Sequence, residues 1–464
     1  MKQATRTRLG GLGMYLAFFV ALLNVSVMYL AVPKVMETFH TDLSVQQWFI
    51  GVYPLLQGGF MLAAGTLGDL VGRRGVLTVA TAVFVVASIA SAFAPNVDLL
   101  IVLRGIEGLC SAALIALPPA MLISLLPHGA DDGPTIKRIG MWGGIAGGLA
   151  PVIGGAIVAE YSWPGVFWMS ALLGIVVLVF LALDPREEAV ERGKRFDVWG
   201  QLFSISGFVL ISYALIDGDA QGWGSLPIVA AFAIGAAALW AMVAYETHSR
   251  HPMIQVRYFK RRKFNVSLVI LGIVNFAWYG LFLLCAVFLQ EVRHDGPFLS
   301  GIFLLPCNAT FFAANIASVW FARRFGMVQT AAISFMITLV AMAWLGIMSV
   351  DTHGWQIAAA LGVAGIGWGL IVTPGTALGM EAVPDKDEGF ASATQALVRA
   401  LFGVFGVALL GSIPGNAVES TAFMRGWPIA MLVAGGLTAA FGVVVVLMIR
   451  GRDADLPVLE RRSA

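Results

Sequence analysis

Long apolar stretches, each about the length of a membrane-crossing helix, follow one another along nearly the whole chain. A helix rises about 1.5 Å per residue, so about 20 apolar residues cross a hydrocarbon layer roughly 30 Å thick. The polar turns between the stretches are too short to fold as domains outside the membrane. The pattern predicts fourteen transmembrane helices, at 12–33, 45–68, 75–94, 98–124, 139–159, 164–183, 197–216, 226–246, 264–290, 298–321, 328–350, 355–380, 390–413 and 428–449.

The composition agrees with an all-α integral membrane protein. Hydrophobic residues make up 59% of the 464-residue chain, charged residues make up 12%, and the mean hydropathy is +0.85. A soluble domain carries roughly 25% charged residues. Because so few charges cannot cover a water-facing surface of this size, we expect the chain to lie in a lipid bilayer and to have no nucleic-acid partner.

The basic residues are distributed unevenly between the two predicted sides of the membrane. If the N-terminus is cytoplasmic, all but five of the 29 Lys and Arg residues fall in cytoplasmic loops or tails. The positive-inside rule therefore predicts a multi-pass protein of the plasma or inner membrane with both termini in the cytoplasm. The five exceptions are Lys34, Arg293 and Arg425 on the outer side and Arg104 and Arg399 within spans.

Two of the longer cytoplasmic connections, 184–196 and 247–263, bracket the pair of spans at 197–246. Without that pair, six spans remain on each side, and transporters built from two such halves bind substrate between them near the membrane midplane. We therefore predict a six-helix bundle in 1–183, a linker with two extra helices in 184–263, and a second six-helix bundle with a short tail in 264–464.

Sequence motifs of catalysis are missing from the chain. It contains no G-x-x-x-x-G-K-[ST], H-E-x-x-H, C-x-x-C or G-x-S-x-G, and its six histidines are scattered. We expect no enzymatic activity, no cofactor and no metal site. Cys110, Cys285 and Cys307 all fall within predicted spans, where we expect them to act as small packing residues.

The turn between the second and third spans carries a recognisable pattern, GTLGDLVGRRG at 65–75. Glycines allow close helix approach and a tight turn, and an acid at the membrane surface can pair with an arginine. The segment resembles the loop signature of the major facilitator superfamily, G-x-L-x-D-x-x-G-R-[KR]. The resemblance implies a role in gating for Gly65, Asp69, Gly72, Arg73 and Arg74.

Further segments resemble one branch of that superfamily, the fourteen-spanner drug:proton antiporters. Leu100–Gly108 is similar to the fourth-span motif, in which Gln is usual at Glu107, and the segments 252–264 and 389–406 are similar to later parts of that branch. GIAGGLAPVIGG at 144–155 is similar to the fifth-span antiporter motif, which implies a gating hinge, with helix packing alone as the alternative. The residues concerned are Gly147, Gly148, Pro151, Gly154 and Gly155.

The first span departs from the family pattern L-D-x-T-x-x-N-x-A-x-P. Asn24 replaces the acid and Tyr29 replaces the later Asn, so a titrating group must lie elsewhere if transport is proton-coupled. Arg104 and Glu107 are ionisable residues at membrane depth, spaced to share one helix face, and such residues are functional by default. Two interpretations stay open, a static ion pair and a Glu107 that titrates while Arg104 and substrate compete for it.

These observations predict a secondary-active transporter, acting as a monomer, that exports small amphiphilic molecules in exchange for protons by alternating access. One alternative is a facilitator or exporter of metabolites or organic anions with weak or no proton coupling, which Asn24 and the intramembrane arginines favour. Another is a non-transporting receptor or scaffold. Polar and aromatic candidates for the substrate cavity are Asn24, Tyr29, Tyr53, Gln57, Asn275, Trp278, Tyr279, Asn308, Thr373 and Arg399.

Overall fold

The structure, a computed structural model, describes residues 3–41, 43–126, 133–183, 197–248, 256–384, 387–414 and 420–450. Most of these residues are helical, and no strand occurs among them. The predicted linker 184–196, residues 249–255 of the connection 247–263, which include the 252–254 part of the family pattern, and the tail from 451 lie outside the described residues.

The described helices confirm the predicted all-α membrane fold. Thirteen are long and apolar enough to cross a membrane, and α2 makes fourteen if its parts Ser44–Met61 and Ala63–Val71, bent by 49°, count as one span. The helices are α1 (Gln3–Phe39), α2 (Leu43–Val71), α3 (Arg73–Ala92), α4 (Val97–Ser124), α5 (Gly133–Tyr161), α6 (Pro164–Leu183), α7 (Val198–Gln221), α8 (Leu226–His248), α9 (Arg262–Val287), α10 (Pro297–Phe325), α11 (Met327–Gly346), α12 (Gly354–Glu381), α13 (Glu388–Ser412) and α14 (Ser420–Arg450). Two short elements flank α9, the 3-10 helix η1 (Val256–Lys260) and the π-helix η2 (Phe288–Val292).

Two bundles, α1–α6 and α9–α14, repeat the same packing. In the first, α4 packs on α2 and α3, and α6 packs on α3; in the second, α12 packs on α10 and α11, and α14 packs on α11. Equivalent turns also share a backbone feature: Gly72 (φ 105°) precedes α3 and Gly326 (φ 81°) precedes α11. A positive φ favours glycine because it lacks a Cβ. The two bundles thus also share a glycine with the same backbone conformation at equivalent turns.

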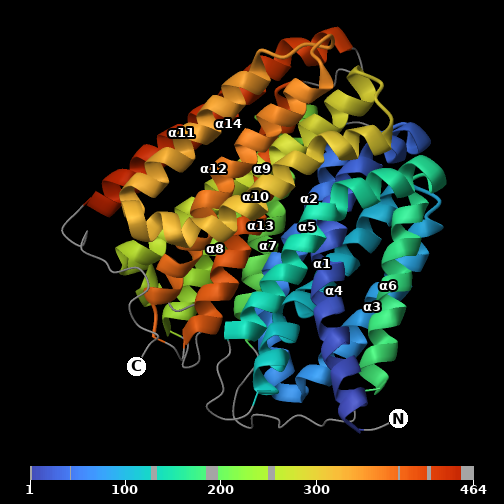
Figure 1. Ribbon diagram of the computed structural model, residues 1–464, viewed down its shortest axis with the longest axis vertical. Coiled ribbons are helices and arrows are strands. Elements are labelled where there is room, and N and C mark those ends of the chain that lie inside the picture. The colour runs from blue at the N-terminus through green and yellow to red at the C-terminus, as the bar shows by residue number, and fades with distance from the viewer. Residues whose placement is uncertain are drawn as a thin grey trace.

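The two bundles touch through α5 with α10 and through α2 with α13. In the repeat, α5 is equivalent to α13 and α10 is equivalent to α2. The two contacts between the bundles are therefore equivalent to each other, as a pseudo-twofold axis requires. Figure 1 shows α9–α14 leaning toward the upright α1–α6, so that the bundles converge at the top and separate toward the bottom, where α1 begins. We call the bottom the terminal face and the top the far face.

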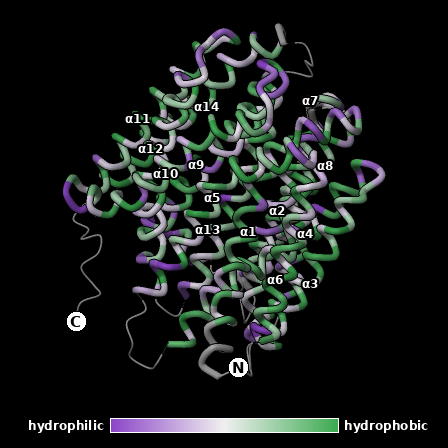
Figure 2. Tube along the Cα trace, turned by 45° about the vertical axis from the view of Figure 1, so that its right-hand side comes forward, coloured by the Kyte–Doolittle hydropathy of each residue, from purple (hydrophilic) through white to green (hydrophobic). Residues whose placement is uncertain are grey.

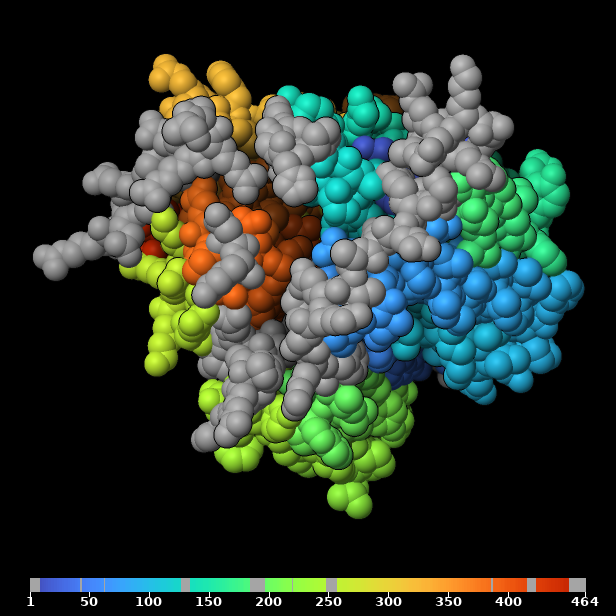
Figure 3. Space-filling model, turned by 90° about the horizontal axis from the view of Figure 1, so that it is seen from below, coloured from blue at the N-terminus to red at the C-terminus, as the bar shows by residue number. Residues whose placement is uncertain are grey.

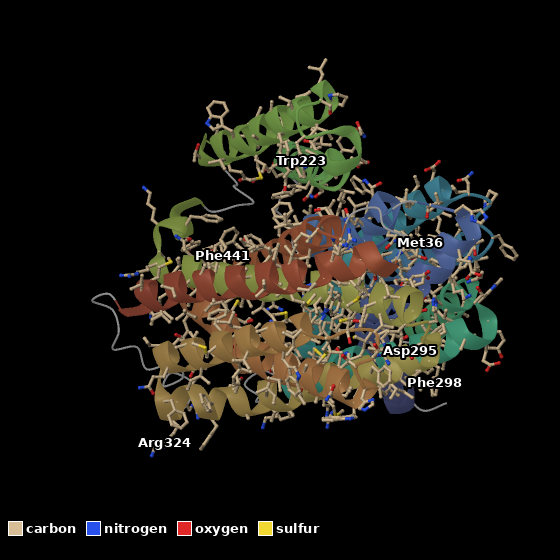
Figure 4. The ribbon with its side chains drawn as sticks, turned by 90° about the horizontal axis from the view of Figure 1, so that it is seen from above. Met36, Trp223, Asp295, Phe298, Arg324 and Phe441 are labelled. Carbon is tan, nitrogen blue, oxygen red and sulfur yellow. The ribbon has the colours of Figure 1, made fainter. Side chains whose placement is uncertain are left out.

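The helices α7 and α8 form a hairpin at the edge of the molecule. Seen from above in Figure 4, the hairpin stands to one side, with Trp223 at its turn. It is joined to α2 by two hydrogen bonds, Trp48 Nε1 to Asp217 Oδ2 at 2.7 Å and Gln201 Nε2 to the Gly59 carbonyl at 2.6 Å. On α13 it packs against apolar side chains that include Leu401, Val404 and Ala408.

The outer surface is apolar along the middle of the helices, whereas hydrophilic residues gather at turns and helix ends (Figure 2). Large apolar side chains are exposed there, including Val86, Trp240 and Ile316 at 66%, 74% and 69% of their surface. Continuous apolar surface of this kind would aggregate in water. It shows that these helices face lipid.

Candidate functional site

Arg104 and Glu107 form a buried ion pair on α4. Arg104 Nη1 donates to Glu107 Oε2 at 2.8 Å, and the two residues lie three positions apart, on one helix face. The other carboxylate oxygen of Glu107 accepts a hydrogen bond from Ser88 Oγ on α3 at 2.8 Å. Arg104 is 1% exposed and Glu107 is not exposed at all, so both oxygens of this acid are satisfied away from water.

Asn24 contributes the third member of the network. Its Oδ1 accepts from the same Arg104 Nη1 that serves Glu107, and its Nδ2 donates to Ser170 Oγ on α6 at 2.8 Å. The guanidinium also lies over the ring of Tyr53, 4.3 Å from its centroid. Cation–π contact of this kind adds to the stabilisation when the charge is desolvated.

The network lies inside the α1–α6 bundle, since its members come from α1, α2, α3, α4 and α6. In this conformation Glu107 faces Ser88 of α3, not a path between the bundles. A proton could therefore reach Glu107 only after a rearrangement that breaks the pair. The static and the titrating interpretations of Glu107 both stay predictions. The hydroxyls Ser88 and Ser170 were missed by the sequence analysis because a lone serine in a span carries no pattern.

The contact between α5 and α10 depends on glycines near the far face. A Cβ added to Gly155 would overlap the Pro297 carbonyl oxygen and lie 3.0 Å from Phe298 Cα, and one added to Gly301 would overlap the Pro151 carbonyl oxygen. Backbone therefore packs directly against backbone at this seam. Small residues allow this approach between membrane helices, and here they hold the two bundles closed at the far face.

The other three glycines that are gating candidates in the fifth-span motif have different neighbours. Gly154 faces Val27 of α1, within its own bundle, whereas nothing lies within 4 Å of a Cβ added to Gly147 or Gly148. Gly154 and Gly155 thus have packing roles in this conformation. Gly147 and Gly148 have space for a methyl group, so only the predicted hinge function would require glycine there.

The second seam, between α2 and α13, also runs from the far face to mid-membrane. Gln47 Nε2 donates to the Ala408 carbonyl at 3.4 Å, and a Cβ added to Gly58 would lie 2.6 Å from Ala400 Cβ. Toward the terminal face, α2 is less closely packed: a Cβ on Gly65 would meet nothing within 4 Å, and Val71 is 66% exposed. Seen from below in Figure 3, the surface recedes between the orange atoms of α13 and the cyan atoms of α5.

The loop from α2 to α3 is held by charge and by backbone conformation. Arg73 Nε and Nη2 donate to Asp69 Oδ1 at 3.0 and 2.9 Å, and Arg74 Nη2 donates to the Leu181 carbonyl of α6 at 2.8 Å. Gly72, with φ 105°, makes the turn between the helices. The structure thus brings together four of the five gating candidates, whereas Gly65 faces open space.

We expect Asp69→Asn to slow transport by about threefold to tenfold, with normal insertion into the membrane. A hydrogen bond to a charged group contributes about 1.5–3 kcal/mol, and solvent screening reduces this free energy for a partly exposed pair. Gly72→Val should slow transport further, because a β-branched residue at a positive φ strains the turn. Transport rates normalised to protein in the membrane check both changes. Gly75→Ala is the matched control, since a Cβ there meets nothing within 4 Å. Normal rates in Asp69→Asn and Gly72→Val would contradict the gating role.

Three of the predicted cavity residues form part of an aromatic cluster between the bundles. Tyr29 of α1 lies 6.2 Å, centroid to centroid, from Tyr279 of α9, and its hydroxyl is buried without a hydrogen-bond partner. Trp278 stacks on Phe282 at 5.0 Å and touches the ring of Trp368 at 5.2 Å. The cluster supplies the apolar and aromatic lining that small-molecule sites commonly have.

The other cavity candidates have mixed surroundings. Asn275 and Asn308 donate only to carbonyls one turn earlier in their own helices. Gln57 donates to Ser111 Oγ, and Thr373 donates to Asn315 Oδ1 at 2.6 Å, so these two bridge helices. Arg399 donates from Nη2 to Thr376 Oγ1 of α12 at 2.6 Å; Thr376 and Asn315 are polar partners that the sequence analysis did not select.

Comparison with known proteins adds to this geometry. The model of the family described as the Major Facilitator Superfamily matches residues 14–407. The chain is 29% identical over 414 residues to the multidrug resistance protein Stp of Mycobacterium tuberculosis, covering 89% of this chain and 76% of that protein. It is 28% identical over 402 residues to the methylenomycin A resistance protein of Bacillus subtilis, covering 86% and 85% of the two chains.

A similar fold occurs among solved structures. The POT family transporter PepTSo matches with a TM-score of 0.69 at 14% identity, covering 96% of this chain and 99% of that one. At this level of identity the match speaks for the fold alone.

Proposed function

The chain belongs to the Major Facilitator Superfamily, and from this premise we propose that it exports small amphiphilic molecules from the cytoplasm in exchange for protons. A small-molecule substrate and a bilayer follow from the family. The direction of transport, the proton coupling, the cytoplasmic termini and action as a monomer are parts of the proposal.

The observation that carries the proposal is the arrangement of the two seams. The bundles are joined at the far face by backbone contacts at Gly155 and Gly301, and they separate toward the terminal face (Figure 1). A transporter closed on one face and open on the other presents its binding site to one compartment at a time. If the terminal face is cytoplasmic, this conformation is the one that takes up substrate for export.

The relatives support the direction and the type of substrate. One is named a multidrug resistance protein and another confers resistance to methylenomycin A, and resistance of this kind is consistent with removal from the cytoplasm. The aromatic cluster around Trp278 suits a molecule with apolar surface. A proton-coupled cycle needs a group that changes charge, and Glu107 is the acid that we propose for it.

Uptake into inverted membrane vesicles tests the proposal. Vesicles with the wild-type chain should accumulate rhodamine 123 above vesicles without it when respiration acidifies the interior, and nigericin, which collapses the pH gradient, should remove the excess. No excess uptake of either rhodamine 123 or its free acid, rhodamine 110, would contradict export. Excess uptake that survives nigericin, in vesicles shown to have lost the gradient, would contradict proton coupling and favour the facilitator alternative.

A further inference from the structure

Arg399 differs from the other intramembrane arginine in having no acidic partner. It lies near the middle of α13 and makes one hydrogen bond to a side chain, Thr376 Oγ1. No described carboxylate lies within ion-pair distance of it, and its Nε is buried without a partner. Arg104, in contrast, has Glu107 at 2.8 Å. Of these two arginines, only Arg104 has its charge neutralised within the described chain.

An isolated guanidinium at this depth is unfavourable. A charge near the membrane centre is costly to insert, and a guanidinium stays charged and offers five N–H donors in a planar fork. That fork matches a carboxylate, which can accept two parallel hydrogen bonds. An arginine that is unpaired in one state of the transport cycle is therefore suited to bind an anion reversibly.

The surroundings of Arg399 indicate what else that anion carries. Tyr279 of α9 lies within electrostatic reach of the guanidinium, and Gly403, one turn along α13, packs against the Tyr279 ring. Tyr279 continues through Tyr29 into the aromatic cluster, and the Tyr29 hydroxyl is another buried donor without a partner. A cation at the edge of an aromatic surface fits a molecule with an acidic group on an apolar body.

Arg399 is not fully enclosed. The residue is partly exposed while its Nε is buried, and α13 is covered by α9, α2 and α7 on other sides. Its hydrogen bond crosses to α12, a helix that otherwise makes few contacts with α13. In Figure 3 the orange atoms of α13 border the hollow of the terminal face. A solute that enters from that face would meet Arg399 before the closed far-face seam.

We propose that Arg399 binds the carboxylate of an amphiphilic substrate, with the aromatic cluster around Tyr279 and Trp278 receiving the apolar part. This assignment rests on the proposed export function and narrows its substrate class to organic acids. Arg399 makes direct contact with substrate, and Thr376 positions it.

Two dyes that differ in one group provide the test. Rhodamine 110 carries a free carboxylate, and rhodamine 123 is its methyl ester. Fluorescence anisotropy with the purified full-length protein in nanodiscs should give tighter binding of rhodamine 110, by roughly 10- to 100-fold, the range for hydrogen bonds to a charged group. Arg399→Gln should lose this preference and keep its affinity for the ester. Arg399→Lys should keep part of the preference, because the charge remains but not the planar fork.

Stability separates a binding role from a structural one. Since Arg399 has no acidic partner, Arg399→Gln should melt at or above the wild-type temperature. A preference for the carboxylate dye that survives in Arg399→Gln, no preference in the wild type, or a much lower melting temperature of Arg399→Gln would each overturn the assignment. If rhodamine 123 is bound and exported but the carboxylate dye is not preferred, the export function is supported and the carboxylate-binding role of Arg399 is contradicted. If neither dye is bound or exported, both proposals are contradicted.

Discussion

Replacing Glu107 by Gln should destabilise the protein by about 3–5 kcal/mol and abolish pH-driven transport. The loss of stability is expected because Arg104, 1% exposed, would keep its charge without a carboxylate, and removal of one partner of a buried pair has that effect. The loss of coupling is expected because Gln has no proton to exchange. Thermal unfolding in nanodiscs and uptake driven by a pH gradient measure the two effects separately.

A second substitution separates charge balance from coupling. Asn24 Oδ1 and Glu107 Oε2 both accept from Arg104 Nη1, and the antiporter pattern that this chain resembles has the acid at position 24 and Gln at position 107, the reverse of this chain. Asn24→Asp added to Glu107→Gln should therefore restore most of the stability. If pH-driven transport returns with it, the coupling acid can sit on either side of Arg104; if not, its position on α4 matters.

The exposed acid Glu160, at the end of α5, provides the matched control, and Glu160→Gln should change neither stability nor coupling. If Glu107→Gln transports against a gradient with unchanged pH dependence, Glu107 is not the coupling acid. A fall in stability without any transport defect would leave it as the structural partner of Arg104.

Alanine at Gly155 or Gly301 should slow transport by roughly 5- to 100-fold. The added Cβ would overlap a backbone carbonyl of the opposite bundle, backbone cannot move aside as a flexible side chain does, and overpacking costs about 1–3 kcal/mol. The overlap destabilises the conformation that is closed at the far face. The population should therefore shift toward the conformation that is open at the far face. Initial rates of rhodamine 123 uptake in inverted vesicles measure the effect.

Gly147→Ala and Gly148→Ala are the matched controls, because their added Cβ atoms meet nothing within 4 Å in the closed conformation. If the motif acts at the seam, these two variants should transport at near wild-type rates. If they are as slow as Gly155→Ala, the motif acts as a flexible hinge in α5. The explanation by steric overlap between α5 and α10 would then be wrong.

The membrane spans could be predicted from the sequence because lipid demands a continuous apolar run wherever a helix crosses. The predicted span at 164–183 coincides with α6, and others differ mainly by helix extensions into the polar surface, such as α1, which runs to Phe39. The family could also be identified, because the turn at 65–75 and the fifth-span glycines have fixed spacing.

The site could be predicted only in part. The spacing of Arg104 and Glu107 implied their pairing on one helix, but the contacts of Arg104 with Asn24 and of Glu107 with Ser88 depend on how three helices, α1, α3 and α4, pack. The same limit applies to the glycines: the run from Gly144 to Gly155 looks uniform in sequence, yet only the packing shows that Gly155 meets α10 and Gly147 meets nothing. For Arg399, in contrast, no acid lies within one helical turn in the sequence, and only the packing shows that no described carboxylate from another helix pairs with it.

Alternating access is the central claim, and α5 and α10 allow it to be measured at both ends of the same helix pair. Spin labels at Glu160 and Phe298 report on the far face, and labels at Ile136 and Arg324 report on the terminal face; all four side chains are exposed, and Figure 4 shows Phe298 and Arg324 at opposite ends of α10. Electron–electron distance measurements in nanodiscs should show the far-face distance lengthening as the terminal-face distance shortens when pH or substrate is changed. Distances that never change, or that lengthen together at both faces, would contradict the account.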